Sequence, residues 1–355
     1  MTNDFFAPKL LAWYERYGRD LPWRHTTNPY HIWLSEIILQ QTRVVQGMPY
    51  YYRFIETFPT ITDLAHADER EVLRLWQGLG YYSRARNLHR TAKIVVEDYG
   101  GIFPTTYQEL LKLKGIGPYT AAAIASFAFC EKVAVLDGNV YRVLSRIFGI
   151  ETDITSHAAK AQFTQRANSL ISAEHPDLFN HAIMDFGATQ CVPVSPQCMF
   201  CTFNQVCEAN LTGRQSQLPV KAKKAKVRDR FFHYIVLEDE QGRLAMRERT
   251  GKDVWTNMFD FLLIEDEQLL DWETLSQHAS LQPLLPELVL LEESPVYTHV
   301  LSHQRIETRF WHLKVTRPLA LPEPLHWYTP EAIDQLPKSV LVLKFIDQWV
   351  SKITD

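Results

Sequence analysis

The chain has 355 residues, of which 46% are hydrophobic and 22% are charged. This composition is that of an ordinary globular protein with about two domains, and it excludes disordered, collagen-like and coiled-coil proteins. The longest apolar run, residues 120–130, is shorter than the ~18 residues of a membrane span, and no basic segment followed by an apolar one opens the chain. We therefore expect a cytoplasmic protein without membrane segments.

Charge is distributed unevenly along the chain, whose net charge is −4. Residues 1–225 carry 23 lysines and arginines against 20 acids, and residues 226–355 carry 14 against 21. A weakly basic part followed by an acidic part indicates two different functions. The basic excess alone does not indicate a nucleic-acid partner, because local clustering decides phosphate binding.

Residues 4–210 show helical periodicity interrupted by glycine and proline, which predicts an all-helical domain. Within it, we interpret residues 29–44 (P-Y-H-I-W-L-S-E-I-I-L-Q-Q-T-R-V) as one strongly apolar helix with a single acid, Glu36. An acid on a helix is usually exposed. A buried Glu36 would instead have a raised pKa and could act as a general acid near neutral pH.

The next informative segment is L-K-G-I-G-P-Y-T-A-A-A-I, residues 113–124. Gly115 and Gly117 lie between a helix expected to end near Lys114 and one expected to begin near Tyr119. Glycines let the backbone approach a surface closely, and a helix N-terminus attracts anions. The segment is therefore either a helix-hairpin-helix that grips a DNA phosphate or a tight turn with a glycine cap.

Asp137 precedes a predicted helix that carries Tyr141, Arg142 and Arg146. An aspartate at this place is most often an N-cap. It can also be a carboxylate, kept ionised by N–H donors, that faces a cation forming in the substrate. Glu36 and Asp137 would then be the two carboxyls that cleavage of a glycosidic bond needs, one to protonate the leaving group and one to stabilise an oxocarbenium-like centre.

Four of the five cysteines follow the spacing C-x6-C-x2-C-x5-C, at Cys191, Cys198, Cys201 and Cys207, while Cys130 stands apart. The absence of a secretory signal argues against disulfides. The spacing favours a [4Fe-4S] cluster over zinc, because zinc sites usually combine two C-x2-C pairs. Zinc remains the alternative.

Residues 211–230 are polar and basic, which predicts a linker. Residues 231–249 alternate around a turn at 240–242 like a β-hairpin, and residues 296–315 predict two more strands, so the second domain is expected to be α+β. The aromatic segment 255–261 is expected to lie in its core.

Six segments together resemble the adenine DNA glycosylases of the MutY type, within the helix-hairpin-helix DNA glycosylase superfamily that also holds endonuclease III. They are L-P-W-R (21–24), S-E-I-I-L-Q-Q-T-R-V (35–44), G-L-G-Y-Y-S-R-A-R-N-L (78–88), L-K-G-I-G-P-Y-T-A-A-A-I (113–124), L-D-G-N-V-Y-R-V (136–143) and the four-cysteine loop. The resemblance implies a helical glycosylase domain at 1–210, with a six-helix part at about 25–135 and a cluster part formed by 1–24 and 136–210. A linker at 211–230 and a Nudix-like domain at 231–355 would follow.

The implied activity is base-excision repair. The resemblance implies a monomer that flips adenine mispaired with 8-oxoguanine or guanine out of duplex DNA and hydrolyses its N-glycosidic bond. Glu36 would protonate adenine N7 and help position water, and Asp137 would stabilise the oxocarbenium ion. The remaining implied site residues are Tyr119 beside the departing base, Asn139 supporting the acids, Trp23 and Arg24 in the adenine pocket, and Gln41, Thr42, Leu79 and Tyr81 around the opposite base. The [4Fe-4S] cluster would hold a DNA-contacting loop.

Tyr119 separates this chain from bifunctional members of the superfamily. Those enzymes have a lysine here, whose amine forms a Schiff base and cuts the strand. Tyrosine cannot form an imine, and Lys112 and Lys114 lie on the hairpin side. We therefore predict a monofunctional glycosylase with little or no lyase activity.

The second domain resembles the family's Nudix-like domain but contains no Nudix box (G-x5-E-x7-R-E-x2-E-E). Hydrolysis of nucleoside diphosphates is therefore not expected. The family recognises 8-oxoguanine with a Phe-Ser-His loop, and Ser302 and His303 match it while Leu301 replaces the aromatic. This replacement removes the aromatic packing role, although Ser302 could still donate to the lesion. The alternative is a plain loop between strands with a solvated histidine.

Three other functions fit parts of the sequence. An iron-sulfur electron carrier would explain the cysteines but not Glu36, the hairpin or the second domain. A noncatalytic DNA-binding module would explain the hairpin and the basic linker, and it would be unaffected by Glu36→Gln. Among enzymes, the alternative is an endonuclease III-like glycosylase, against which Tyr119 argues.

Overall fold

A computed structural model describes residues 5–222 and 227–354. Over these ranges, no helix combines the length and apolar character needed to cross a membrane. The described chain forms two compact units: residues up to 66 with 87–222, and residues 67–86 with those from 227 onward. The predicted linker falls partly on residues 223–226, which lie outside the described residues, and the domain boundaries derived from the sequence stay predictions.

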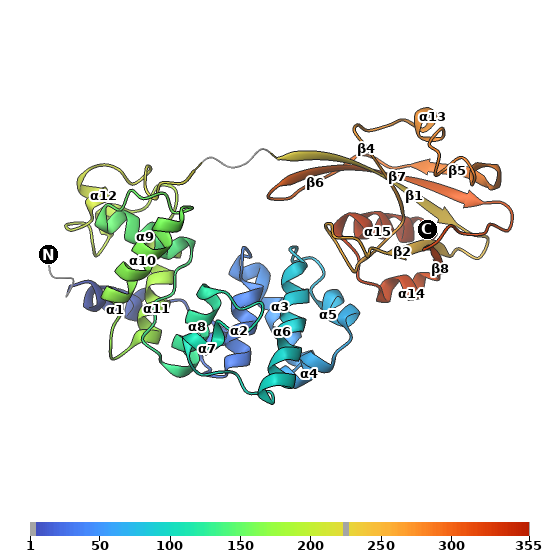
Figure 1. The fold of residues 1–355 in the computed structure, drawn as a ribbon. Helices are drawn as coiled ribbons and strands as arrows, with labels where there is room; N and C mark the ends of the chain where they lie inside the picture. The colour runs from blue at the N-terminus through green and yellow to red at the C-terminus, as the bar shows by residue number, and fades with distance from the viewer. Residues whose placement is uncertain (1–4, 223–226, 355) are drawn as a thin grey trace. The chain divides into compact units, whose positions relative to one another are not determined.

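The first unit is helical, as its periodicity predicts (Figure 1). Its helices are α1 (Phe6–Tyr17), α2 (Pro29–Ile38), α3 (Val44–Thr57), α4 (Ile61–His66), most of α6 (Ser83–Tyr99), α7 (Tyr107–Leu110), α8 (Pro118–Phe129), α9 (Gly138–Phe148), α10 (His157–Leu170), α11 (Pro176–Asp185) and α12 (Glu208–Leu211). Short turns of 3₁₀ or π type occupy Pro22–Arg24, Phe186–Gln190 and Cys198–Phe200. Helix α2 packs against α8, and α1 packs against α11.

Helix α2 lies deep in this unit because nearly all of it is apolar. Asn28 caps it by accepting a hydrogen bond from the backbone N–H of Tyr30, and Pro29 occupies its first turn. The prediction of one helix over 29–44 is wrong, since α2 ends at Ile38 and α3 begins at Val44. Gln41 interrupts the helix with a left-handed backbone (φ 56°).

The second unit contains α5 (Glu69–Leu75) and a mixed sheet with helices. Its other elements are β1 (Arg228–Glu238), β2 (Leu244–Glu248), β3 (Phe259–Asp260), β4 (Leu262–Asp266), α13 (Trp272–Leu275), β5 (Leu288–Glu293), β6 (Tyr297–Val300), β7 (Gln304–Val315), β8 (His326–Tyr328), α14 (Pro330–Gln335) and α15 (Val340–Thr354), with a 3₁₀ turn at Leu285–Glu287. The predicted hairpin of β1 and β2 and the predicted strands β6 and β7 are present.

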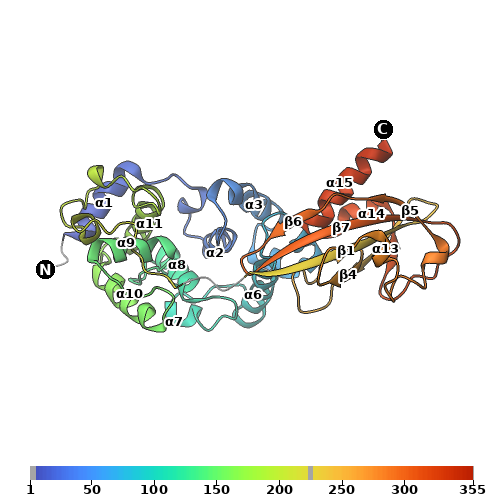
Figure 2. The same cartoon turned by 90° about the horizontal axis from the view of Figure 1, so that it is seen from above.

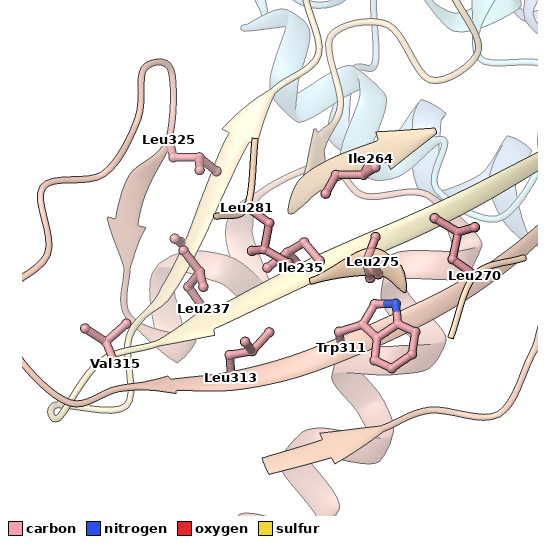
Figure 3. Close-up of a cluster of buried hydrophobic side chains, with 11 residues drawn as sticks. Ile235, Leu237, Ile264, Leu270, Leu275, Leu281, Trp311, Leu313, Val315 and Leu325 are labelled. Carbon is pink, nitrogen blue, oxygen red and sulfur yellow. The ribbon is translucent and has the colours of Figure 1, made fainter. Parts of the chain in front are cut away.

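Strands β1 and β7 form the centre of the sheet and run parallel, with Arg228 opposite Gln304 and Ile235 opposite Trp311 (Figure 2). The sheet order is β3-β2-β1-β7-β5. One face carries an apolar cluster that includes Leu237, Leu313 and, from α13, Leu275 (Figure 3). On the other face, Phe345 of α15 stacks on Phe310 with ring centroids 4.7 Å apart. The apolar side chains of segment 255–261 are buried, as the sequence predicts.

Candidate active site

A cavity of about 860 Å³ opens in the first unit between α2, the start of α8 and the start of α9. Its walls combine carboxyl, hydroxyl, amide and cationic side chains with apolar ones. Every candidate residue of the first unit other than the cysteines lines it, namely Trp23, Arg24, Glu36, Gln41, Thr42, Gly115, Gly117, Tyr119, Asp137 and Asn139.

Glu36 is buried on α2, with 7% of its surface exposed. The hydroxyl of Tyr119 donates a hydrogen bond to its Oε2 at 2.5 Å. Burial raises the pKa of Glu36 to about 7, and nearby Asp137 also raises it, while the hydrogen bond from Tyr119 opposes this shift. The side chain can therefore hold or release a proton near neutral pH.

Tyr119 lies in the first turn of α8, directly after Pro118. Burial raises the pKa of its hydroxyl well above the ordinary value, and the neighbouring Glu36 raises it further. The hydroxyl therefore stays protonated and can only donate to an ionised Glu36.

Asp137 is the N-cap of α9. Its Oδ1 accepts a hydrogen bond from the backbone N–H of Val140 at 2.7 Å, and its Oδ2 accepts one from Nδ2 of Asn139 at 2.7 Å. Burial raises the pKa of Asp137 despite these two donors, which lower it. Asn139 in turn accepts a hydrogen bond from Arg142 at 2.7 Å, so its amide orientation is determined.

Asp185, at the end of α11, is a site residue that the sequence did not reveal. Its fully buried carboxylate accepts two hydrogen bonds from the Arg24 guanidinium, both at 2.8 Å, and others from Arg19. Burial raises the pKa of Asp185, but the hydrogen bonds from Arg24 and Arg19 outweigh it and lower the pKa overall. This ion pair holds Arg24 in the wall of the cavity.

His181 on α11 also lines the cavity. Its ring stacks on Phe127 with centroids 3.9 Å apart. Burial, and to a smaller degree Arg24, lowers the pKa of His181 to about 3, so the ring is neutral at physiological pH. Nothing in the sequence indicates that His181 lines the cavity, because a single histidine in an amphipathic helix has no motif around it.

Gly115 and Gly117 form the predicted hairpin between α7 and α8. Gly115 has φ 96°, and a Cβ there would lie 2.6 Å from Oγ1 of Thr91. Gly117 caps α8 and faces open space. Helix α7, the first helix of this hairpin, ends at Leu110, four residues earlier than predicted. Residues 111–115 form turns instead of continuing the helix.

The four cysteines Cys191, Cys198, Cys201 and Cys207 line one small cavity with unoxidised thiols. Arg146 donates a hydrogen bond to Sγ of Cys191 at 3.5 Å, and the backbone N–H of Phe203 donates one to Sγ of Cys201 at 3.4 Å. Burial raises the pKa of Cys201 to about 11. Across the described ranges, no three His, Cys, Asp or Glu side chains are placed to hold a single metal ion.

The remaining candidates belong to the second unit. Leu79 is buried, whereas Tyr81 is partly exposed with a left-handed backbone (φ 48°). Tyr81 and His303 line one cavity of about 610 Å³, together with Leu301. Ser302 is exposed beside this cavity, with its Oγ 3.2 Å from Nδ1 of His303.

Two family models match the chain. The HhH-GPD superfamily of base excision DNA repair proteins matches residues 34–169, and the NUDIX domain matches residues 233–348. With the two acids in one cavity, these matches define a DNA glycosylase of the helix-hairpin-helix class followed by a Nudix-like domain.

Comparison with curated relatives identifies the family of DNA glycosylases to which the chain belongs. The adenine DNA glycosylase of Buchnera aphidicola subsp. Baizongia pistaciae (strain Bp) is 36% identical over 274 residues, which are 77% of this chain and 78% of that protein. The adenine DNA glycosylase of Homo sapiens is 43% identical over 222 residues, which are 60% of this chain and 41% of that protein. The chain belongs to the adenine DNA glycosylase family, as the sequence motifs indicate.

Solved structures show the same helical fold. A thermostable thymine-DNA glycosylase is 31% identical with a TM-score of 0.56, covering 59% of this chain and 97% of its own. A trapped endonuclease III–DNA covalent intermediate is 22% identical with a TM-score of 0.53, covering 60% of this chain and 99% of its own. At that identity the second likeness concerns the fold alone.

Proposed function

We propose that this enzyme removes adenine mispaired with 8-oxoguanine or guanine from duplex DNA by hydrolysis, without cutting the strand. The placement of Glu36 and Asp137 in one cavity carries this proposal. Glu36 has a pKa near neutrality, and Asp137 receives two hydrogen bonds that favour its ionised form. Such a pair provides an acid for the leaving base and a negative charge for the sugar.

The proposed reaction begins with adenine flipped into the cavity. Glu36 gives its proton to N7, the bond from C1′ to N9 breaks, and the bonding electrons leave with adenine. Asp137 stabilises the positive charge that develops on the sugar. Water then adds to C1′ and returns a proton to Glu36, which restores the enzyme.

The absence of lyase activity follows from Tyr119. The side chain beside Glu36 is a phenol, which cannot form an imine with the opened sugar. Among the described residues that line the cavity there is no lysine, and neither Lys112 nor Lys114 is one of them. No amine is therefore positioned to attack C1′.

Four thiols around one cavity support a [4Fe-4S] cluster held by the four cysteines, and their spacing C-x6-C-x2-C-x5-C favours the cluster over zinc. The donor set is entirely sulfur, and the N–H donors from Arg146 and Phe203 suit thiolate ligands. The cluster would act as a structural crosslink, with the cysteines fixing the loop between residues 191 and 207.

Recognition of the opposite base is assigned to the second unit. Tyr81 and His303 share a cavity, and Ser302 lies at its edge. Gly115 and Gly117 would bring backbone N–H groups to a DNA phosphate. The enzyme would act as a monomer on duplex DNA.

Single-turnover base release tests the proposal. One duplex carries adenine opposite 8-oxoguanine and another carries thymine glycol opposite adenine, each quenched with and without hot alkali. Release of adenine with strand breaks only after alkali is expected, and borohydride should trap no covalent complex. Release of thymine glycol with breaks before alkali would overturn the proposal and indicate an endonuclease III-like enzyme.

A further inference from the structure

The cavity of the second unit contains a hydrogen-bond donor that no element of the proposed mechanism uses. Gln304, the first residue of β7, lines this cavity with Tyr81, His303 and Lys252. Only 5% of its surface is exposed. Its Nε2 is buried and has no hydrogen-bond partner within the described part of the chain. Buried amide groups are normally paired, so this one indicates a missing acceptor.

The orientation of the Gln304 amide is determined by its neighbour. Its Oε1 accepts a hydrogen bond from Arg230 at 3.3 Å. Because a guanidinium can only donate, the amide oxygen must face Arg230 and the NH2 group must point elsewhere. Arg230 itself donates two hydrogen bonds each to Asp253 and Glu265, at distances between 2.7 and 2.9 Å. Gln304 is therefore a donor on a rigid support.

The rest of the cavity fits a purine. Tyr81 and Trp255 supply aromatic walls, and Lys252 supplies a cation that forms no ion pair among the described residues. Trp255 is fixed by a left-handed backbone (φ 60°) and by a ring contact with His299 at 5.6 Å. Arg86 lines the same cavity as a second cation. Aromatic walls with cationic side chains and one directed donor are the features that bind a base and its phosphate.

We propose that Gln304 is a specificity-determining residue whose Nε2 donates a hydrogen bond to the C8 carbonyl oxygen of 8-oxoguanine opposite the adenine. This assignment rests on the proposed function. Guanine and 8-oxoguanine differ at two positions, a carbonyl at C8 and a hydrogen on N7. N7 accepts a hydrogen bond in guanine but carries a hydrogen in 8-oxoguanine, so a donor whose own oxygen is engaged by Arg230 can favour 8-oxoguanine only through the C8 carbonyl.

The test replaces Gln304 with methionine or leucine, which keep the side-chain size but remove the donor. The control is Gln241→Leu, the same loss of an amide in the exposed turn between β1 and β2. Single-turnover adenine release and duplex affinity are measured with 8-oxoguanine, guanine or 8-bromoguanine opposite the adenine. Thermal unfolding of each variant reports its folding.

We expect both Gln304 variants to lower the preference for 8-oxoguanine over guanine about tenfold, with guanine and 8-bromoguanine duplexes changed less than twofold. The control should match the wild type. An unchanged preference, or an equal loss on all three duplexes in a folded variant, overturns the role of Gln304. The wild type alone tests the proposed function, which fails if the wild type releases no adenine or shows no preference for 8-oxoguanine. The variants test only the role of Gln304.

Discussion

Glu36 combines two properties, burial in an apolar helix and a hydrogen bond from Tyr119, whose own pKa is raised well above its ordinary value by burial and by Glu36. Burial keeps its proton bound up to about pH 7. Asp137 differs because a helix N-terminus and Asn139 both donate to it. The proposed mechanism depends on this difference between the two environments, because it needs one carboxyl that donates a proton and one that is ionised.

The rate of base release should depend on pH through Glu36. Since the proton donor is the protonated form and its pKa is about 7, the single-turnover rate should fall about tenfold per pH unit well above pH 7. Glu36→Gln should abolish release while duplex affinity stays within a few-fold. A wild-type rate that keeps rising above pH 8 would contradict the role of Glu36 as acid.

The same burial should destabilise the protein. Folded Glu36 binds its proton more tightly than the unfolded chain does, so stability falls as pH rises from about 4.5 to about 7 and is level above that range. A shift of this size corresponds to about 3 kcal/mol at most. Glu36→Gln should therefore unfold at a higher temperature than the wild type at pH 8, with a smaller difference at pH 5. Calorimetry at both pH values measures this, and an equal difference at both would argue against a buried charge.

At the element scale, local signals predicted much of the structure. Asp137 as an N-cap, the β1–β2 hairpin and the glycine hairpin before α8 each follow from residues close together in the chain. The break after Ile38 could not be predicted from glycine or proline, because the residue with the left-handed backbone there is Gln41. Asp185 could not be identified as a site residue from the sequence for a different reason. Its partners Arg24 and Arg19 lie about 160 residues away, and only folding brings them together.

The two glycines of the hairpin should respond differently to alanine. Gly115→Ala requires a left-handed alanine and a shift of Thr91, so we expect a loss of about 1–2 kcal/mol in stability together with weaker DNA binding. Gly117→Ala meets no atom within 4 Å and should fold normally. It should weaken only the affinity for duplex, because its methyl group occupies the surface expected to meet a phosphate. Thermal unfolding and duplex titration separate the two effects, and equal stabilities would contradict the strain at Gly115.

At the scale of the whole molecule, each unit has its own core. The helical unit is built around α2 and α8, and the sheet unit is built on the two faces of β1 and β7. The parallel pairing of β1 with β7 could not be predicted from the sequence. Alternation of apolar and polar residues predicts that a segment is a strand, but it does not predict which distant strand is its partner. The comparisons with family models divide the chain in a similar way, with a helical match followed by a Nudix match.

A mutation in one core should therefore unfold one unit first. Phe345→Ala removes the ring that stacks on Phe310, and we expect a loss of about 3–5 kcal/mol in the sheet unit. Hydrogen exchange followed by mass spectrometry should show faster exchange in the sheet peptides and unchanged protection in α2 and α8. Uniformly faster exchange in both units would show that they unfold as one.

The pairing of β1 with β7 also has a consequence for synthesis on the ribosome. Arg228 meets its partner Gln304 only after 76 further residues have been added, which at cellular elongation rates takes roughly 4–15 s. During that interval β1 is an apolar strand without its central neighbour, and β2 and β4 can pair only with its remaining edge. A chain cut short before residue 304 would therefore expose the unpaired backbone edge of β1, which can pair with a strand of another chain. Complete translation would protect the enzyme from aggregation by supplying β7 to cover that edge.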